Sequence, residues 1–402
     1  MKTMKRESEN CMDFIEAVHR RRVYPLMYCH AELSGSLNIE ILKQAVSTSS
    51  QFVPEILCAY DYRHNRFIDK GFTAKDVIHT AEAALPQWEL DKAPQFRITV
   101  CQKRHTASLI FGMSHILADG KGFLQYLYLL AALYNGKNPD VHNKREIASV
   151  LNGIHVGRQT MRIRYGKAPA VQPLRSQNQG EKFFCLCCFT SENDFAAIRT
   201  KAKSSRATLN DVFMAAYARV IARRQSIEQV TISCPADLRR FHWMSDTLTV
   251  ANMTGIYREV PVDVLPDDPF YRTLSQISIE MNLQKSRRRC FSGIPLLNWA
   301  YPKFPRWIVA QAIKKTYHIM PISYTNIGVI DHRKLSFNGC QMTNCFVTGT
   351  YRLPPDFQLS ISTFRDTCTL NCVLVGEPFE ENSAQEILEQ VKQELLSWAK
   401  NE

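Results

Sequence analysis

The segment from residue 111 to 123, FGMSHILADGKGF, places a histidine, an aspartate and a glycine directly after an apolar run. A histidine side chain ordinarily has a pKa near ~6.5, so it can remove a proton at neutral pH from a hydroxyl or amine within hydrogen-bond distance. His115 is the candidate for this general base. Asp119 is too far along a turn to be assumed its partner, but its carboxylate can fix the loop by pairing with an arginine. Gly120 would permit a positive φ and the close approach of a substrate.

The local pattern predicts elements that would position these three residues. Residues 95–102 and 106–115 alternate as strands do, and residues 122–136 show helical spacing of apolar side chains up to Gly136. The motif therefore lies between a strand and a helix. The alternative is a histidine that merely ends a strand, since three fixed positions in six recur by chance.

The rest of the chain repeats this mixture of elements. Residues 137–180 are polar and gather Pro, Gly and Gln, which predicts a linker. Ser191 and Thr208 are candidate N-caps of two helices, strands are expected over 229–240 and 247–260, a hairpin turns near Arg365, and Ser383 could cap a final helix. We expect an α+β protein of two lobes, 1–170 and 171–402.

Composition limits the class of protein. The chain has 402 residues, of which 45% are hydrophobic and 22% charged, as in ordinary globular proteins. Its first residues lack the apolar stretch of a signal peptide, and no run reaches the ~18 apolar residues of a membrane span, so we predict a cytoplasmic protein without a transmembrane segment. The 13 cysteines include no zinc-finger pairs. Cys185, Cys187 and Cys188 lie in a strand-like aromatic stretch, and we predict no metal site.

Basic residues are unevenly distributed. The formal net charge is +12, and residues 282–320 contain basic side chains interleaved with aromatic ones and no Asp or Glu. The simplest interpretation is a solvated basic face with its aromatic residues turned inward. Nucleic-acid binding would rest on charge alone and is not predicted.

The ordered motifs resemble a known superfamily. SHILADGKGF is similar to the HxxxDG motif of the chloramphenicol-acetyltransferase-like superfamily, which includes condensation domains of peptide synthetases, wax ester synthases and alcohol-acetyltransferase-like enzymes. TLNDVFMAAYARV, CPADLRRF, TVANMTGIYREV and SYTNIGVID resemble later segments of the family, in the same order. The resemblance covers roughly residue 31 to the end.

This resemblance implies a fold and a reaction. Two lobes of mixed sheets and helices would meet around a central tunnel, with His115 as general base at its centre. The protein would be an acyltransferase that moves an acyl group from a thioester of coenzyme A or of phosphopantetheine on a carrier protein to a small-molecule alcohol or amine. No acyl-enzyme and no permanently bound cofactor are required.

The resemblance also assigns further residues. Asp119 and Gly120 would be structural, with Asp119 paired to Arg239; Arg240 is the alternative partner. The side chains predicted to line the tunnel are Ser114, Asn252, Thr325 and Asn326. Independently of the resemblance, the basic segment 282–320 would attract the phosphates of coenzyme A or the acidic face of a carrier protein if it flanks the donor entrance. The residues predicted there are Arg287, Arg288 and Arg289.

Two departures from the family pattern narrow the prediction. Peptide-forming condensation domains usually carry a second histidine where this chain has Ser114, and the DFGWG segment of plant acyltransferases is absent. The first departure favours the stand-alone acyltransferase branches, and the second disfavours plant-type alcohol acylation and leaves the acyl donor open. Ser114 lacks a GxSxG elbow, so a serine hydrolase is not predicted. The remaining alternative is a catalytically silent docking or gating module with the same fold.

Overall fold

The computed structural model describes residues 10–81, 87–152, 154, 174–175, 180–241, 247–265, 267–317 and 319–401. Of the predicted linker, 137–180, the structure describes residues 137–152, 154, 174–175 and 180, and the rest lies outside the described residues. Within the described residues, no helix combines the length and apolar character that crossing a bilayer requires.

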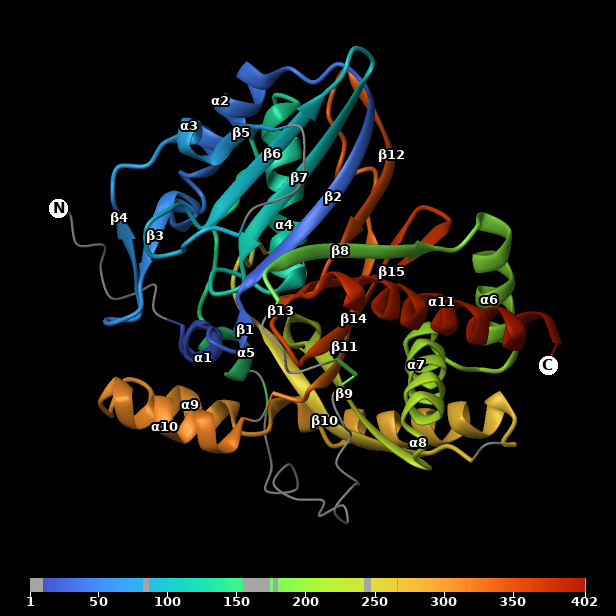
Figure 1. Ribbon diagram of the computed structural model, residues 1–402. Helices are drawn as coiled ribbons and strands as arrows, with labels where there is room; N and C mark the ends of the chain where they lie inside the picture. The colour runs from blue at the N-terminus through green and yellow to red at the C-terminus, as the bar shows by residue number, and fades with distance from the viewer. Residues whose placement is uncertain are drawn as a thin grey trace.

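A five-stranded mixed sheet organises the N-terminal half of the chain (Figure 1). Its strand order is β12-β2-β7-β6-β5, antiparallel except for β5 and β6. The strands are β2 (Leu26–Gly35), β5 (Ile78–Thr80), β6 (Phe96–Gln102), β7 (Thr106–Ser114) and β12 (Cys340–Val347). The two predicted strands, 95–102 and 106–115, are thus β6 and β7.

Two helices pack on one another beside this sheet: α2 (Ile39–Ser49) and α4 (Gly120–Tyr134). The apolar positions of α4, among them Phe123, Leu127 and Leu130, are fully buried, which explains the helical spacing in the sequence. Asp119 caps α4 by accepting a hydrogen bond from the Gly122 amide. The smaller elements of this half are η2 (Pro54–Leu57), β3 (Cys58–Asp61), β4 (Arg66–Asp69), α3 (Ala74–Val77) and α5 (Ala148–Leu151).

A six-stranded sheet organises the C-terminal half. Its path is β1-β13-β15-β14-β11, with β8 also paired to β15. The strands are β1 (Val23–Tyr24), β8 (Lys182–Phe189), β11 (Ile322–Ile330), β13 (Tyr351–Arg352), β14 (Phe357–Phe364) and β15 (Thr367–Gly376). The predicted hairpin is β14–β15, and Arg365 occupies its turn with a φ of 51°.

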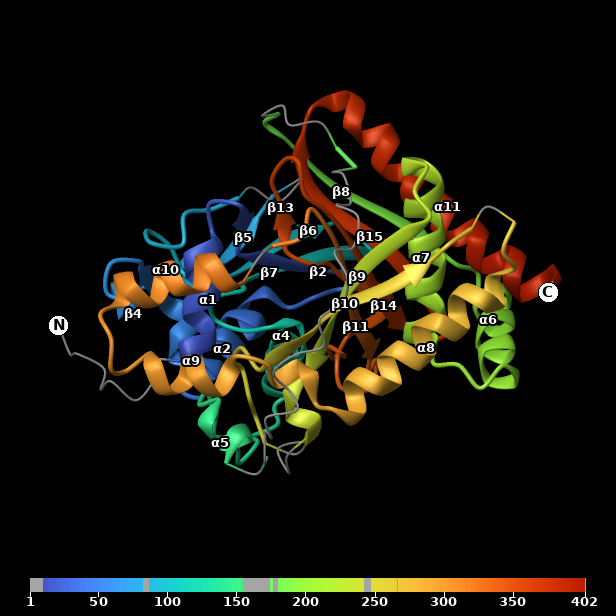
Figure 2. The same ribbon diagram turned by 90° about the horizontal axis from the view of Figure 1, so that it is seen from below.

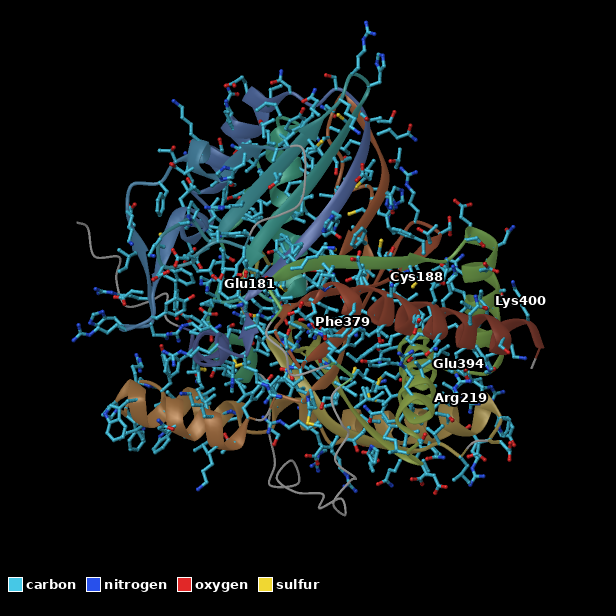
Figure 3. All side chains as sticks on the ribbon, viewed as in Figure 1. Glu181, Cys188, Arg219, Phe379, Glu394 and Lys400 are labelled. Atoms are coloured by element: carbon cyan, nitrogen blue, oxygen red, sulfur yellow. The ribbon has the colours of Figure 1, made fainter. Side chains whose placement is uncertain are left out.

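Three helices accompany this sheet: α6 (Glu192–Ser204), α7 (Leu209–Gln225) and α11 (Pro378–Asn401). Ser191 and Thr208 cap α6 and α7, as predicted. Arg219 of α7 and Glu394 of α11 form an ion pair between the two helices (Figure 3). Ser383 lies inside α11, which begins at Pro378, so the predicted cap at Ser383 is wrong.

The remaining described elements are a two-stranded ribbon and six helices or short helical turns. The ribbon is β9 (Gln229–Asp237) paired with β10 (Thr254–Asp263). The helices are α1 (Cys11–His19), η4 (Leu238–Phe241), α8 (Phe270–Ser286), η5 (Arg289–Phe291), α9 (Ile294–Ala300) and α10 (Arg306–Thr316). Helices α9 and α10 lie at one edge of the molecule, alongside α1 (Figure 2).

Part of the strand predicted over 247–260 is irregular: β10 begins only at Thr254. The reason is that side chains take the backbone bonds of residues 249–251. Gln125 Oε1 accepts from the Thr249 amide, and Asn143 Oδ1 accepts from the Val250 amide. Arg239 Nη2 donates to the carbonyl oxygens of Thr249 and Ala251. Residues 249–251 were predicted to be part of a strand, but their backbone groups are hydrogen-bonded to side chains instead.

The two halves of the chain share their sheets. Strand β12 comes from the C-terminal half yet pairs with β2, and β1 comes from the N-terminal half yet pairs with β13. Met342, Cys345 and Val347 of β12 accordingly belong to the hydrophobic core of the N-terminal sheet. The predicted α+β class, with mixed sheets and helices, is confirmed, while the division at residues 170 and 171 stays a prediction.

Candidate active site

The loop that follows β7 carries His115 and is held from two sides. The His115 amide donates to the carbonyl oxygen of Pro25 at 2.8 Å. From the C-terminal half, Asn252 Nδ2 donates to the carbonyl oxygens of His115 at 2.8 Å and Ile116 at 2.9 Å. Ile116 itself is fully buried. The backbone on which the histidine stands is therefore fixed by both halves of the molecule.

The imidazole faces a carboxylate that sequence reasoning did not find. His115 Nδ1 lies 3.7 Å from Glu16 Oε2, and Glu16 belongs to α1. Nδ1 is buried and makes no hydrogen bond, which leaves Nε2 as the ring nitrogen through which this side chain can meet a ligand. A carboxylate beside Nδ1 favours the tautomer that carries its proton there and leaves a lone pair on Nε2. No local pattern links two residues so far apart in the chain.

A buried arginine shares the surroundings of Glu16. Arg352 of β13 is 7% exposed, and its Nε makes no hydrogen bond within the described chain. Burial lowers the pKa of the Arg352 guanidinium, while the nearby charges of Asp356 and Glu16 act in the opposite direction. Burial likewise raises the pKa of Tyr317, and the charge of Glu16 adds to that rise. Two buried side chains, Arg352 and Tyr317, therefore lie within electrostatic reach of Glu16, whose own side chain is 26% exposed.

Asp119 joins the histidine loop to the C-terminal half. Its Oδ2 accepts from Arg239 Nη1 at 3.0 Å, from the Met253 amide at 2.7 Å and from the Thr254 hydroxyl at 2.9 Å. Its Oδ1 accepts from the Gly122 amide at 2.8 Å. The structure thus brings together the two side chains that the resemblance pairs. Arg240, the alternative partner, is exposed.

The electrostatics of this pair favour its charged form. Burial alone would raise the pKa of the Asp119 carboxyl, but the Arg239 charge and the hydrogen bonds hold this pKa below its usual value. Arg239 also donates through Nε to the Thr249 hydroxyl and through Nη1 to Asp237. With its donors occupied in this way, the buried guanidinium avoids the desolvation cost of an unpaired charge.

A second buried ion pair, between Arg145 and Asp13, also holds the histidine loop. Arg145 donates through Nη1 to the Leu117 carbonyl oxygen at 2.9 Å and through Nη2 to Asp13 Oδ2 at 2.7 Å. Asp13 Oδ1 accepts from Asn252 Nδ2. Burial raises the pKa of Asp13 to about 6, although Arg145 and Asn252 oppose this shift. Helix α1 thus contributes both Asp13 under the loop and Glu16 beside the imidazole.

Gly120 acts differently from the expectation. Its φ is not among the positive values, so the predicted left-handed turn is wrong. A Cβ at Gly120 would instead lie 2.7 Å from Ile327 Cδ1 of β11. The glycine therefore leaves room for a side chain of the C-terminal half at the start of α4.

The predicted tunnel-lining residues occupy different places. Ser114 is fully buried, and its hydroxyl accepts from the Ile116 amide, which stabilises the loop. Asn252 is buried under the loop, as described above. Thr325 and Asn326 lie on β11, next to the Ile327 that touches Gly120, and Asn326 Nδ2 donates to Asn210. No hydrogen bond in the described chain joins these two residues to His115, and their role as tunnel lining stays a prediction.

The three predicted donor-entrance arginines follow the end of α8. Arg287 and Arg288 are exposed, whereas Arg289 is partly buried. Their segment packs on β10, because a Cβ at Gly255 would lie 2.1 Å from the Cys290 carbonyl oxygen. No described contact joins them to His115, so a role at the donor entrance stays a prediction.

The described residues contain no group of three or more His, Cys, Asp or Glu arranged to hold a metal ion. Cys185 does have a histidine neighbour in space, His30, whose Nε2 lies 3.4 Å from the sulfur. Burial lowers the pKa of His30 to about 4 and raises that of Cys185 to about 12. Both groups are therefore neutral near pH 7, as expected for a packing contact.

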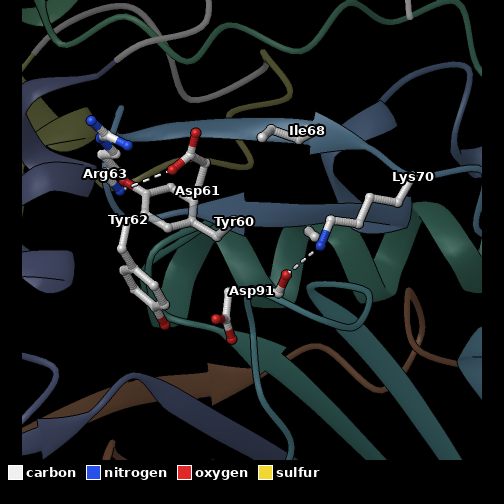
Figure 4. Close-up of a pocket in the computed structure, with 8 residues that line it drawn as sticks. Tyr60, Asp61, Tyr62, Arg63, Ile68, Lys70 and Asp91 are labelled. Atoms are coloured by element: carbon white, nitrogen blue, oxygen red, sulfur yellow. Dashed lines mark hydrogen bonds between the residues drawn. The ribbon is translucent and has the colours of Figure 1, made fainter.

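One pocket of about 290 Å³ lies on the β3–β4 hairpin (Figure 4). Tyr60, Tyr62, Arg63, Lys70 and Asp91 are among its lining residues, and His115 is not. Lys70 is already engaged there, because its Nζ donates to the Asp91 carbonyl oxygen. This pocket therefore does not form part of the histidine site.

Comparisons with solved structures identify the fold. Polyketide synthase associated protein 5 from Mycobacterium tuberculosis is 13% identical, with a TM-score of 0.67 over 96% of this chain and 97% of that one. The first condensation domain of the calcium-dependent antibiotic synthetase, in complex with a substrate analogue, is 13% identical, with a TM-score of 0.66 over 98% and 95%. The X-domain from teicoplanin biosynthesis is 13% identical, with a TM-score of 0.62 over 100% and 96%.

No protein-family model and no curated protein sequence matches the chain. At these identities the structural likeness defines a fold: the chain has the two-lobed, chloramphenicol-acetyltransferase-like fold of the condensation domains. The fold predicted from the ordered motifs is confirmed over nearly the whole chain.

Proposed function

We propose that this protein is an acyltransferase. It transfers an acyl group from a thioester, carried by coenzyme A or by the phosphopantetheine of a carrier protein, to a hydroxyl or amine of a small molecule. His115 is the general base, and the acceptor attacks the thioester directly. The condensation-domain fold supports this class of reaction, since one neighbour is bound to a substrate analogue and others come from a polyketide synthase and a nonribosomal peptide synthetase.

The observation that carries the proposal is the arrangement of His115. Its backbone is fixed by Pro25 and Asn252, its Nδ1 faces Glu16, and Nε2 remains for the acceptor. A base on a fixed backbone, with a carboxylate near one ring nitrogen and the other nitrogen left for the acceptor, is suited to proton removal. A docking module has no physical need for a carboxylate beside this imidazole.

The proposed step conserves atoms and charge. His115 Nε2 takes the proton of the acceptor O–H or N–H while the acceptor atom bonds to the thioester carbon. The C–S bond then breaks, and the imidazolium returns the proton to the departing thiolate, giving an ester or amide and a free thiol. Glu16 stabilises the transient imidazolium through its negative charge near Nδ1.

A catalytically silent docking module is the second candidate. A specific observation favours it: one structural neighbour is the X-domain from teicoplanin biosynthesis in complex with OxyB, a use of this fold to hold another protein. The two candidates differ in turnover. A docking module would bind a partner without releasing thiol from any thioester.

The test is turnover by the purified protein. A panel of acyl-CoA and acyl-carrier-protein thioesters is incubated with mixed alcohols and amines, and thiol release and new esters or amides are measured together. We expect His115→Ala to lose about 10²–10⁴-fold in rate while keeping its thermal midpoint. His105→Ala, at an exposed histidine, is the matched control. If His115→Ala turns over as fast as wild type, the general-base assignment is wrong.

A further inference from the structure

Helices α9 and α10 form a hairpin whose outer face is apolar and aromatic. Trp307 is 70% exposed, Leu296 62% and Trp299 51%, and Phe304 and Ile308 are exposed as well. Single exposed apolar residues are common, but five in a span of thirteen positions are not. The interpretation that the aromatic residues of the basic segment turn inward holds for Phe291 and Tyr301, which are buried, and is wrong for Trp299, Phe304 and Trp307.

We call these five exposed side chains the hairpin patch (Leu296, Trp299, Phe304, Trp307 and Ile308). Leu296 and Trp299 are three residues apart on α9 and so occupy the same face. The rings of Trp299 and Phe304 meet edge to face, with centroids 6.0 Å apart. Trp307 and Ile308 follow Phe304 in the first turn of α10.

The opposite face of the hairpin anchors it to the protein. Tyr301, Val309 and Ile313 are buried in the core of the C-terminal half, and the Tyr301 ring lies 5.5 Å from that of Phe14 in α1. The patch is therefore carried by helices that are anchored in the core, and these helices lie at the edge of the molecule (Figure 2). It is not an unpacked segment of the chain.

The charged side chains of the hairpin segment itself are all basic. Residues 282–320 contain no Asp or Glu, and Lys303, Lys314 and Lys315 are exposed. No carboxylate of the described residues pairs with these three ammonium groups. Lys303 Nζ instead lies 4.3 Å from the centre of the Trp299 ring. Apolar aromatic side chains bordered by lysine are the combination that binds the interface of an anionic bilayer.

We propose that the α9–α10 hairpin docks this protein on an anionic lipid surface. The hairpin patch enters the boundary between headgroups and acyl chains, and the three lysines contact the headgroups. The binding is interfacial, in agreement with the absence of a membrane-crossing helix from the described residues. This inference is independent of the acyl-transfer proposal, because it requires no residue of the histidine site.

The test is binding of the full chain to vesicles in low salt, with phosphatidylcholine alone or with one third phosphatidylglycerol. We expect sedimentation with the anionic vesicles, weakened by 0.5 M salt because exposed charges are screened. Lys303→Ala/Lys314→Ala/Lys315→Ala should weaken binding on the order of 100-fold, at about 1 kcal/mol per lysine. The matched control is Lys75→Ala/Lys103→Ala/Lys334→Ala, which removes three exposed lysines elsewhere.

A second pair of variants tests the apolar contribution. Trp299→Ala/Trp307→Ala should weaken vesicle binding about tenfold or more, whereas Tyr271→Ala/Ile279→Ala, at exposed positions of α8, should not. Circular dichroism checks that each variant folds, and brominated acyl chains should quench wild-type tryptophan fluorescence. Absence of binding to anionic vesicles overturns the proposal. So does equal weakening by patch and control variants, or capture of an acidic protein by this face without lipid binding.

Discussion

At the scale of single residues, proton transfer depends on which nitrogen of His115 is free. Glu16 approaches Nδ1 to 3.7 Å, and Nδ1 is buried, so substrate chemistry is left to Nε2. Asn252 holds the peptide that carries the ring but does not touch the ring itself through any described bond. Glu16 and Asn252 therefore act on the histidine in different ways, one through charge and one through backbone position.

Replacement of Glu16 tests the charge contribution. Glu16→Gln keeps the size of the side chain but removes the charge that stabilises the imidazolium, so kcat should fall on the order of 10–100-fold with little change in KM or thermal midpoint. Glu40→Gln, at an exposed position of α2, is the control. Unchanged kcat in Glu16→Gln would show that the carboxylate plays no part in the reaction.

The Asp119–Arg239 pair predicts a pH-dependent stability. Because the folded protein holds the pKa of Asp119 below its usual value, the stabilisation is present above about pH 4 and is lost as the pH falls through the folded value. Asp119→Asn should therefore lower the thermal midpoint most near pH 7, and its difference from wild type should narrow below about pH 4. A difference that is constant with pH would contradict the assigned charge.

A double-mutant cycle separates the pair from its neighbours. Asp119→Ala and Arg239→Ala should each cost about 3–5 kcal/mol, and the double variant should cost less than their sum because the second change removes an orphaned charge. Arg240→Ala is the control, since that side chain is exposed. Denaturant unfolding measures the free energy of unfolding of the wild type, of each single variant and of the double variant. Strict additivity of the losses would show that the pair is not coupled.

At the scale of elements, the first turn of α4 packs against two segments of the C-terminal half. A Cβ at Gly122 would lie 2.9 Å from the Ala251 carbonyl oxygen and 3.0 Å from its amide nitrogen, both backbone atoms. A Cβ at Gly120 would meet only the end of the Ile327 side chain. The sequence does not distinguish the two glycines. In the structure, Gly122 faces backbone atoms, whereas Gly120 faces the end of a side chain.

This difference predicts unequal effects of adding a methyl group. Gly122→Ala should lower the free energy of unfolding by about 1–3 kcal/mol, the usual cost of overpacking, and should reduce activity by displacing the segment that holds His115. Gly120→Ala should cost clearly less, because the Ile327 side chain can rotate away. Thermal denaturation of both variants measures the comparison. Equal costs would contradict the packing described here.

At the scale of the whole molecule, the exchange of strands makes the halves depend on each other. The N-terminal sheet needs β12 to cover the edge of β2, and the C-terminal sheet contains β1. The histidine loop is likewise bonded to Asn252 and Arg239 through Asp119. We therefore propose that residues 1–170 and 171–402 form two lobes that cannot fold independently of each other.

Separate expression of the two halves tests this dependence. Residues 1–170 alone should expose the unpaired edge of β2 and the apolar side chains that β12 covers, so we expect aggregation and no cooperative unfolding. Co-expression with residues 171–402 should give a complex with a single thermal transition. The intact chain is the control. Two fragments that each melt cooperatively would show that the lobes fold alone.

The sequence by itself determined the local elements and the chemistry of one loop. Alternation and helical spacing predicted β6, β7 and α4, since burial of one face imposes those periods, and the ordered motifs predicted the fold and the contact of Asp119 with Arg239. Tertiary structure decided what depends on distant segments. It placed Glu16 beside His115, bonded the backbone of residues 249–251 to side chains where a strand was predicted, and turned Trp299 of α9 and Trp307 of α10 outward. In the first two cases the deciding contact comes from a part of the chain that no local pattern connects to the residue it affects.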